Sequence, residues 1–141
     1  MSAALIAFLR ARLDEREAAA AAAGGTSETW QAWGTGIYSA SSADDDDAPP
    51  LVTTGPEVGG SDEDAARAAH IALHDPAQVL REVEATRGLL RQYAAPETGE
   101  RPADALGRYV AGTQRTAVEM AVRHLAQAHA GHPDYQPEWR P

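Results

Sequence analysis

Two histidines four residues apart, His70 and His74, have the clearest spacing for chemistry in this sequence. On an α-helix, this spacing places both imidazoles on one face, where they can bind one metal ion. His124 is a source of a third ligand, although Ile71 stands where zinc proteases carry a glutamate base. The structural interpretation makes His70 a half-buried core residue and puts His74 at a helix C-terminus, where the dipole stabilises an imidazolium. We favour it and expect no cofactor, with a metal site at His70, His74 and His124 as the alternative.

Other patterns that support catalysis are missing from the sequence. The chain has no cysteine and no lysine, which excludes thiol nucleophiles, disulfides and Schiff-base chemistry. No serine lies in the Gly-x-Ser-x-Gly turn that exposes a nucleophile. The acidic run Asp44–Asp47 lacks the alternating acids and the glycine of a calcium-binding loop. We therefore assign no catalytic residue and expect that the protein is not an enzyme.

The tryptophans and the C-terminal tail are candidates for contacts with another protein. Trp, Tyr and Arg are enriched at the energetic centres of protein interfaces, and the proline-spaced tail over residues 132–141 contains all three. Two interpretations stay open, because this tail can dock on the chain's own body or on a partner. The candidate partner-binding residues are Trp30, Trp33, Asp134, Tyr135, Trp139 and Arg140.

Composition limits the core that can position these residues. Of the 141 residues, 43% are hydrophobic, which is 61 residues, and 31 of those are alanine. The 30 larger apolar side chains suffice for a single small domain over residues 1–141. A thin helical bundle leaves apolar stripes that need cover, so we also expect that a homo-oligomer can form.

The negative charge is concentrated in one segment. The net charge is −9, and residues 24–64 contain nine acids and no base. Nucleic-acid binding requires a basic face, so we expect no nucleic-acid partner. No stretch approaches the ~18 apolar residues of a membrane span, and the apolar residues 3–9 lack the preceding basic residues of a secretory signal. These features predict a cytoplasmic protein that does not bind membranes, with a disordered acidic loop over residues 39–50.

Periodicity and capping signals predict four helices. The sharpest signal is Asp75-Pro76, a cap followed by proline at the first helical position, with Gln78 three residues after the cap. Large apolar residues recur at helical spacing in the first and last helices. The three main helices are predicted over residues 3–23, 76–93 and 102–130, with a short helix over 62–74. The residues of the last helix that hold helical spacing are Leu106, Tyr109, Val110, Thr113, Ala117, Met120, Ala121, His124 and Ala128.

A small β-hairpin is predicted after the first helix. Aromatic and β-branched residues over 30–38 indicate one or two short strands, and residues 51–54 can pair with them. An isolated hairpin is marginally stable, so it has to pack on a helix. The predicted fold is thus mainly α, with α+β as a variant, and the tail over 132–141 is irregular and extended.

Three strings resemble a known family: LIAFLRARLDEREAAA (Leu5–Ala20), HIALHDPAQVLREVEATRGLL (His70–Leu90) and HPDYQPEWRP (His132–Pro141). They are similar to an uncharacterised family of small actinobacterial and actinophage proteins, domain of unknown function 6221. The resemblance implies a bacterial or phage context and no established activity. Such proteins often contain a cysteine before the tail, and its absence here excludes any cysteine-based role. We expect a non-enzymatic interaction or accessory protein whose partner is an unidentified protein.

Overall fold

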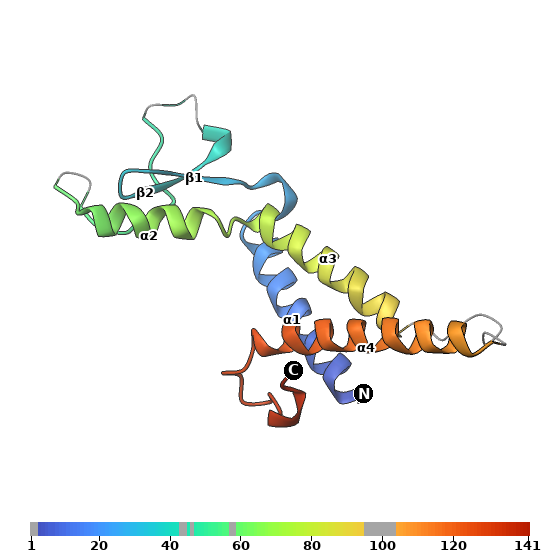
Figure 1. The fold of residues 1–141 in the computed structure, drawn as a ribbon. Coiled ribbons are helices and arrows are strands. Elements are labelled where there is room, and N and C mark those ends of the chain that lie inside the picture. The colour runs from blue at the N-terminus through green and yellow to red at the C-terminus, as the bar shows by residue number, and fades with distance from the viewer. Residues whose placement is uncertain (1–2, 43–44, 46, 57–58, 95–103) are drawn as a thin grey trace. The chain divides into compact units, whose positions relative to one another are not determined.

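The computed structural model describes residues 3–42, 45, 47–56, 59–94 and 104–141. These residues form a mainly helical structure with a small sheet after the first helix and an irregular C-terminal tail (Figure 1), which confirms the predicted fold class. None of the described helices combines the length and apolarity needed to cross a membrane. The elements are α1 (Ala3–Ala22), β1 (Trp30–Trp33), β2 (Gly36–Ser39), β3 (Val52–Thr53), α2 (Asp62–Ala72), α3 (Pro76–Ala94) and α4 (Ala105–Gln127), with 3-10 turns at Gly25–Ser27, Ala40–Ser42 and Pro137–Trp139.

The chain divides into two compact units. Unit 1 comprises Met1–Asp14 and Glu84–Pro141, and unit 2 comprises Glu15–Val83. The single domain expected from the sequence stays a prediction. The predicted acidic loop over 39–50 belongs to unit 2, and its residues 43, 44 and 46 lie outside the described residues.

Side-chain caps define where α2 and α3 begin. At α2, the Ser61 hydroxyl accepts the backbone N–H of Asp64, and the Asp64 carboxylate accepts the N–H of Ser61, both at 3.1 Å. At α3, the Asp75 carboxylate accepts the N–H of Gln78 at 2.6 Å. The predicted cap at Asp75 is therefore confirmed, and both caps satisfy N–H groups that lack partners within their helices.

The last helix is shorter at both ends than predicted. The Asp104 carboxylate accepts the N–H of Gly107 at 2.7 Å, so α4 starts after Asp104 rather than at Pro102, which lies outside the described residues. At the other end α4 stops at Gln127, three residues before the predicted end.

The sheet of unit 2 has three antiparallel strands in the order β1-β2-β3, where the sequence predicted a hairpin. Trp30 pairs with Ser39 in the β1–β2 register. Gly34, in the turn between these strands, adopts a positive φ of 56°, a conformation that glycine tolerates best. Val52 of β3 pairs with Ile37 on the other side of β2.

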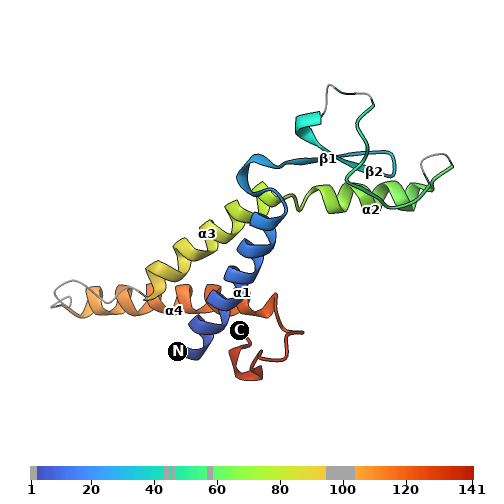
Figure 2. The ribbon, with the colours of Figure 1, turned by 180° about the vertical axis from the view of Figure 1, so that it is seen from behind.

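Helix α2 presents its alanines to this sheet, which lies along it in both views (Figures 1 and 2). Ala68 is fully buried, and Ala65 and Ala72 on the same face are half-buried. His70 and Leu73 are exposed, so the half-buried core position predicted for His70 is wrong. The physical reason is that small side chains let a helix approach a sheet closely, and the alanines occupy a different face from His70.

The core of unit 1 is built on the N-terminal half of α1. Leu5, Leu9 and Leu13 are buried at successive turns, as their spacing predicts. The C-terminal tail folds back beside this part of α1 in both views (Figures 1 and 2). The other buried apolar residues of the unit are Phe8, Leu90, Val122, Ala126 and Trp139.

Candidate functional site

The C-terminal tail docks on the body of unit 1. Trp139 is only 4% exposed, and its ring centroid lies 5.0 Å from that of Phe8 in α1. Tyr135 meets both rings edge-on, at 6.2 Å from Phe8 and 5.8 Å from Trp139. The Arg12 guanidinium lies 5.4 Å from the Phe8 centroid and donates to Nε2 of His132. Of the two interpretations left open for the tail, this packing favours docking on the chain's own body.

Arg123 of α4 holds the tail through backbone carbonyls. Its Nη1 donates to the carbonyl oxygen of Glu138 at 2.8 Å and to that of Arg140 at 3.1 Å. Its Nη2 pairs with the Glu119 carboxylate at 3.1 Å, which fixes the guanidinium in place. Arg140 and Asp134, both predicted to bind a partner, are exposed in this docked tail.

The two tryptophans of the sheet have different surroundings. Trp30 is half-buried, whereas Trp33 is 74% exposed and lies beside Tyr38, with 6.3 Å between the ring centroids. Of the three predicted partner-binding tryptophans, Trp33 is the one that presents its ring to solvent.

His70 in α2 and His74, two residues after its end, are exposed, and no described residue completes a three-ligand group with them. His70 and His74 contact each other edge-on with 5.0 Å between their ring centroids. His124 belongs to unit 1, whereas the pair belongs to unit 2. Within the part of the chain that the structure describes, no group of three or more His, Asp or Glu side chains is suited to a metal ion. The alternative metal site therefore rests on two ligands.

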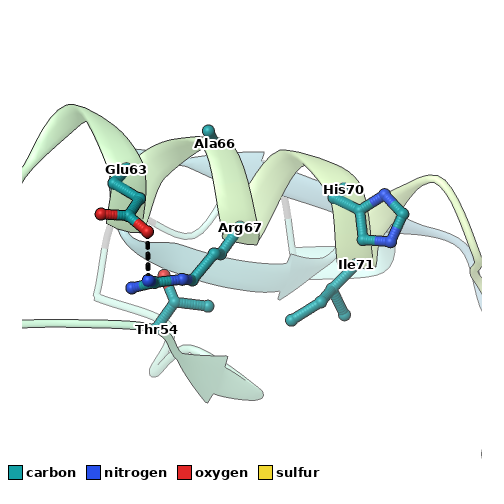
Figure 3. Close-up of a pocket in the computed structure, with 6 residues that line it drawn as sticks. All are labelled: Thr54, Glu63, Ala66, Arg67, His70 and Ile71. Carbon is teal, nitrogen blue, oxygen red and sulfur yellow. Dashed lines mark hydrogen bonds and ion pairs between the residues drawn. The ribbon is translucent and has the colours of Figure 1, made fainter.

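A groove of about 550 Å³ runs along the exposed side of α2 (Figure 3). Its walls are one face of α2 and Thr54, the residue that directly follows β3. His70 and Ile71 lie toward one end of the lining, and Glu63 and Arg67 lie toward the other. The lining residues are Thr54, Glu63, Ala66, Arg67, His70 and Ile71.

The charges at this groove are already paired. Arg67 contacts the Glu63 carboxylate at 2.5 Å and the Asp64 carboxylate at 2.9 Å. Hydrogen bonds from the Ser61 hydroxyl and N–H, together with the positive charge of Arg67, lower the pKa of Asp64. Because two carboxylates neutralise the guanidinium, the groove is suited to an apolar side chain rather than to an anion.

The largest run of exposed apolar side chains in unit 1 lies on α4. Leu106, Val110, Thr113, Ala117 and Met120 alternate spacings of four and three residues, and we call this set the α4 stripe. All five are exposed, Leu106 to 71% and Val110 to 45%. Alternating spacings of four and three are typical of the seam of a coiled coil.

The sequence identified the periodicity of the stripe but not its exposure. It also missed the groove on α2, since that depends on which face the sheet covers. One signal was present: Ala65, Ala68 and Ala72 recur at helical spacing, and such a row is typical of a helix face that packs closely on another element.

Comparison with known proteins adds a family and no activity. The model of a family described as "Family of unknown function (DUF6221)" matches residues 2–141. Neither the comparison with curated proteins nor that with solved structures found a match.

Proposed function

Because the chain belongs to the DUF6221 family, whose description names no activity, we propose its role from the geometry: a non-enzymatic interaction protein that pairs with a second copy of itself along the α4 stripe. The observation that carries this proposal is the exposure of the stripe. A monomeric protein seldom leaves a continuous row of apolar residues on one helix face in water. Covering these side chains removes apolar surface from water at roughly 25 cal/mol per Å².

The chain's own core lies on the other side of α4. Successive helical residues are about 100° apart, so Thr113 and Val122 point in opposite directions. Val122 and Ala126 are fully buried, and they share the face opposite the stripe. The core that receives Val122 is therefore unavailable to the stripe, and a second molecule has to supply the cover.

The stripe is complementary to a copy of itself in an antiparallel pair. With Thr113 at the twofold axis, Leu106 of one copy lies opposite Met120 of the other, and Val110 lies within one residue of the level of Ala117. Both copies then contribute the same patch, as an isologous interface requires. The Thr113 hydroxyl donates to the carbonyl of Tyr109 at 3.0 Å, so its donor is satisfied when the seam is covered.

The flanks of the stripe favour close approach of two copies. Gly107, Tyr109, Gln114, Thr116 and Ala121 border it, and none of them is charged. Two copies can therefore meet without like charges facing each other. This feature favours a second copy over a partner selected by charge.

We place this interaction protein in the cytoplasm of an actinobacterium or its phage, on the similarity of the three strings to that family. An accessory role fits a chain to which no catalytic residue is assigned. An unidentified protein is the other candidate for the stripe, and the experiment below separates the two.

Sedimentation equilibrium of the full chain tests the pairing. We expect the wild-type chain to shift from monomer to dimer as its concentration rises, and Val110→Glu to stay monomeric because it puts a charge in the seam. Ala111→Glu, which adds the same charge at an exposed neighbour outside the stripe, is expected to dimerise like the wild type. A wild type that is monomeric at every concentration would leave the stripe to a different protein, and equal behaviour of the two variants would remove the stripe from the proposal.

A further inference from the structure

A second feature of unit 1 is a pocket that three arginines line. Arg10 and Asp14 come from α1, and Arg87, Leu90 and Arg91 come from α3. The pocket has a volume of about 300 Å³, at the small end of ligand-binding pockets. Its lining carries three positive charges and one negative charge, and the Glu84 carboxylate that pairs with Arg91 brings the local net charge to +1, although the whole chain has a net charge of −9.

Two of the guanidiniums are held in place and one is free. Arg87 donates to the Asp14 carboxylate at 2.6 Å, and Arg91 donates to the Glu84 carboxylate at 2.7 Å. Arg10 is exposed and makes no hydrogen bond or ion pair with any described residue. Leu90 is buried and gives the pocket an apolar wall beside these charges. Because Arg10 has no partner among the described residues and lines the same pocket as Arg87 and Arg91, it can pair with a bound anion.

We propose that this pocket binds the phosphate group of a small phosphomonoester. A phosphomonoester carries a charge of about −1.5 to −2 at neutral pH, opposite in sign to the net charge of the three guanidiniums and their two carboxylate partners. Guanidinium groups donate two parallel hydrogen bonds to phosphate oxygens, and Arg10 has all of its donors available. The organic part of the ligand contacts Leu90.

Charge and size favour this ligand over the other anions. A carboxylate offers two acceptor oxygens, whereas a phosphate group offers three, one for each of the three guanidiniums. An extended nucleic acid needs a broad basic face, whereas here the positive lining is confined to one small pocket. A small molecule with one dianionic group satisfies both conditions. This inference does not depend on pairing along the α4 stripe, which is a different surface.

Isothermal titration with phenyl phosphate as the probe tests the pocket, with inorganic phosphate and benzoate in parallel. We expect phenyl phosphate to bind more tightly than inorganic phosphate, which has no ring to contact Leu90, and benzoate, which has the same ring on a carboxylate, to bind most weakly. Arg10→Gln should weaken phenyl phosphate binding at least tenfold and leave the fold intact, because Arg10 makes no hydrogen bond or ion pair with any described residue. Arg81→Gln, the same charge change on α3 outside the pocket, should leave the affinity unchanged.

A second variant tests the role of the ion pair. Asp14→Asn removes the carboxylate that competes with the ligand for Arg87, so we expect it to bind phenyl phosphate several-fold more tightly. Equal weakening by Arg10→Gln and Arg81→Gln would show diffuse attraction to surface charge and would overturn the proposal. Absence of binding at millimolar phenyl phosphate in both the wild type and Asp14→Asn would overturn it as well.

Discussion

At the scale of single residues, the interactions of Asp64 make the stability of the N-terminus of α2 depend on pH. Its carboxylate accepts the Ser61 N–H and contacts Arg67, and these interactions lower its pKa in the folded state. A lowered pKa means that the stabilisation is complete above the ordinary value of about 3.9 and is lost as the pH falls through the folded-state pKa. The cap therefore contributes at neutral pH and disappears in acid.

We expect Asp64→Asn to lower the free energy of unfolding at pH 7, and this difference from the wild type should vanish near pH 2. Urea denaturation of the wild type and the variant at a series of pH values measures this difference. Asp62→Asn is the matched control, because it removes an acid from the same helical turn that makes no hydrogen bond or ion pair with Ser61 or Arg67. Equal effects of the two variants, or a difference for Asp64→Asn that persists in acid, would contradict the capping role.

Substitution of Trp139 tests whether the C-terminal tail contributes to the core of unit 1 or only lies on its surface. Since this side chain is buried against Phe8, we expect Trp139→Ala to lower the free energy of unfolding by about 3–5 kcal/mol. The adjacent Arg140 is exposed, so Arg140→Ala should change the free energy of unfolding, measured by urea denaturation, by less than about 0.5 kcal/mol. If Trp139→Ala is as stable as Arg140→Ala, the tail does not contribute to the core.

At the scale of elements, two glycines respond to substitution in opposite directions. A Cβ added at Gly112 in α4 meets no atom within 4 Å, so Gly112→Ala should stabilise the protein by roughly 0.5–1 kcal/mol. Gly34 has a positive φ, so Gly34→Ala should destabilise it by about 1–2 kcal/mol. Thermal unfolding of the two variants measures the contrast, and a destabilised Gly112→Ala would mean that α4 is irregular there.

The elements differ in how far their sequences predict them. The cap at Asp75 and the leucine stripe of α1 are set by local hydrogen bonds and spacing, so the sequence predicts them. The face that α2 turns to the sheet depends on tertiary packing, and for that reason the position of His70 was predicted wrongly. The α4 stripe was visible as a periodicity, but its exposure follows from the core meeting the opposite face, at Val122.

At the scale of the whole molecule, charge separates the two units. Unit 1 contains nine arginines and eight acids, a net charge of +1, whereas unit 2 contains three arginines and thirteen acids, a net charge of −10. Two copies of unit 1 can therefore approach with little repulsion, while copies of unit 2 repel each other. This distribution favours the proposed pairing through unit 1, which contains the α4 stripe.

Disulfide trapping of Thr113→Cys tests the central proposal most directly. The natural chain has no cysteine, so this variant has a single thiol, placed where the twofold axis of the antiparallel pair is expected. Under mild oxidation we expect rapid formation of a covalent dimer, measured on a non-reducing gel, and Ala111→Cys outside the stripe should form little. Equal and slow cross-linking of both variants would contradict pairing along α4.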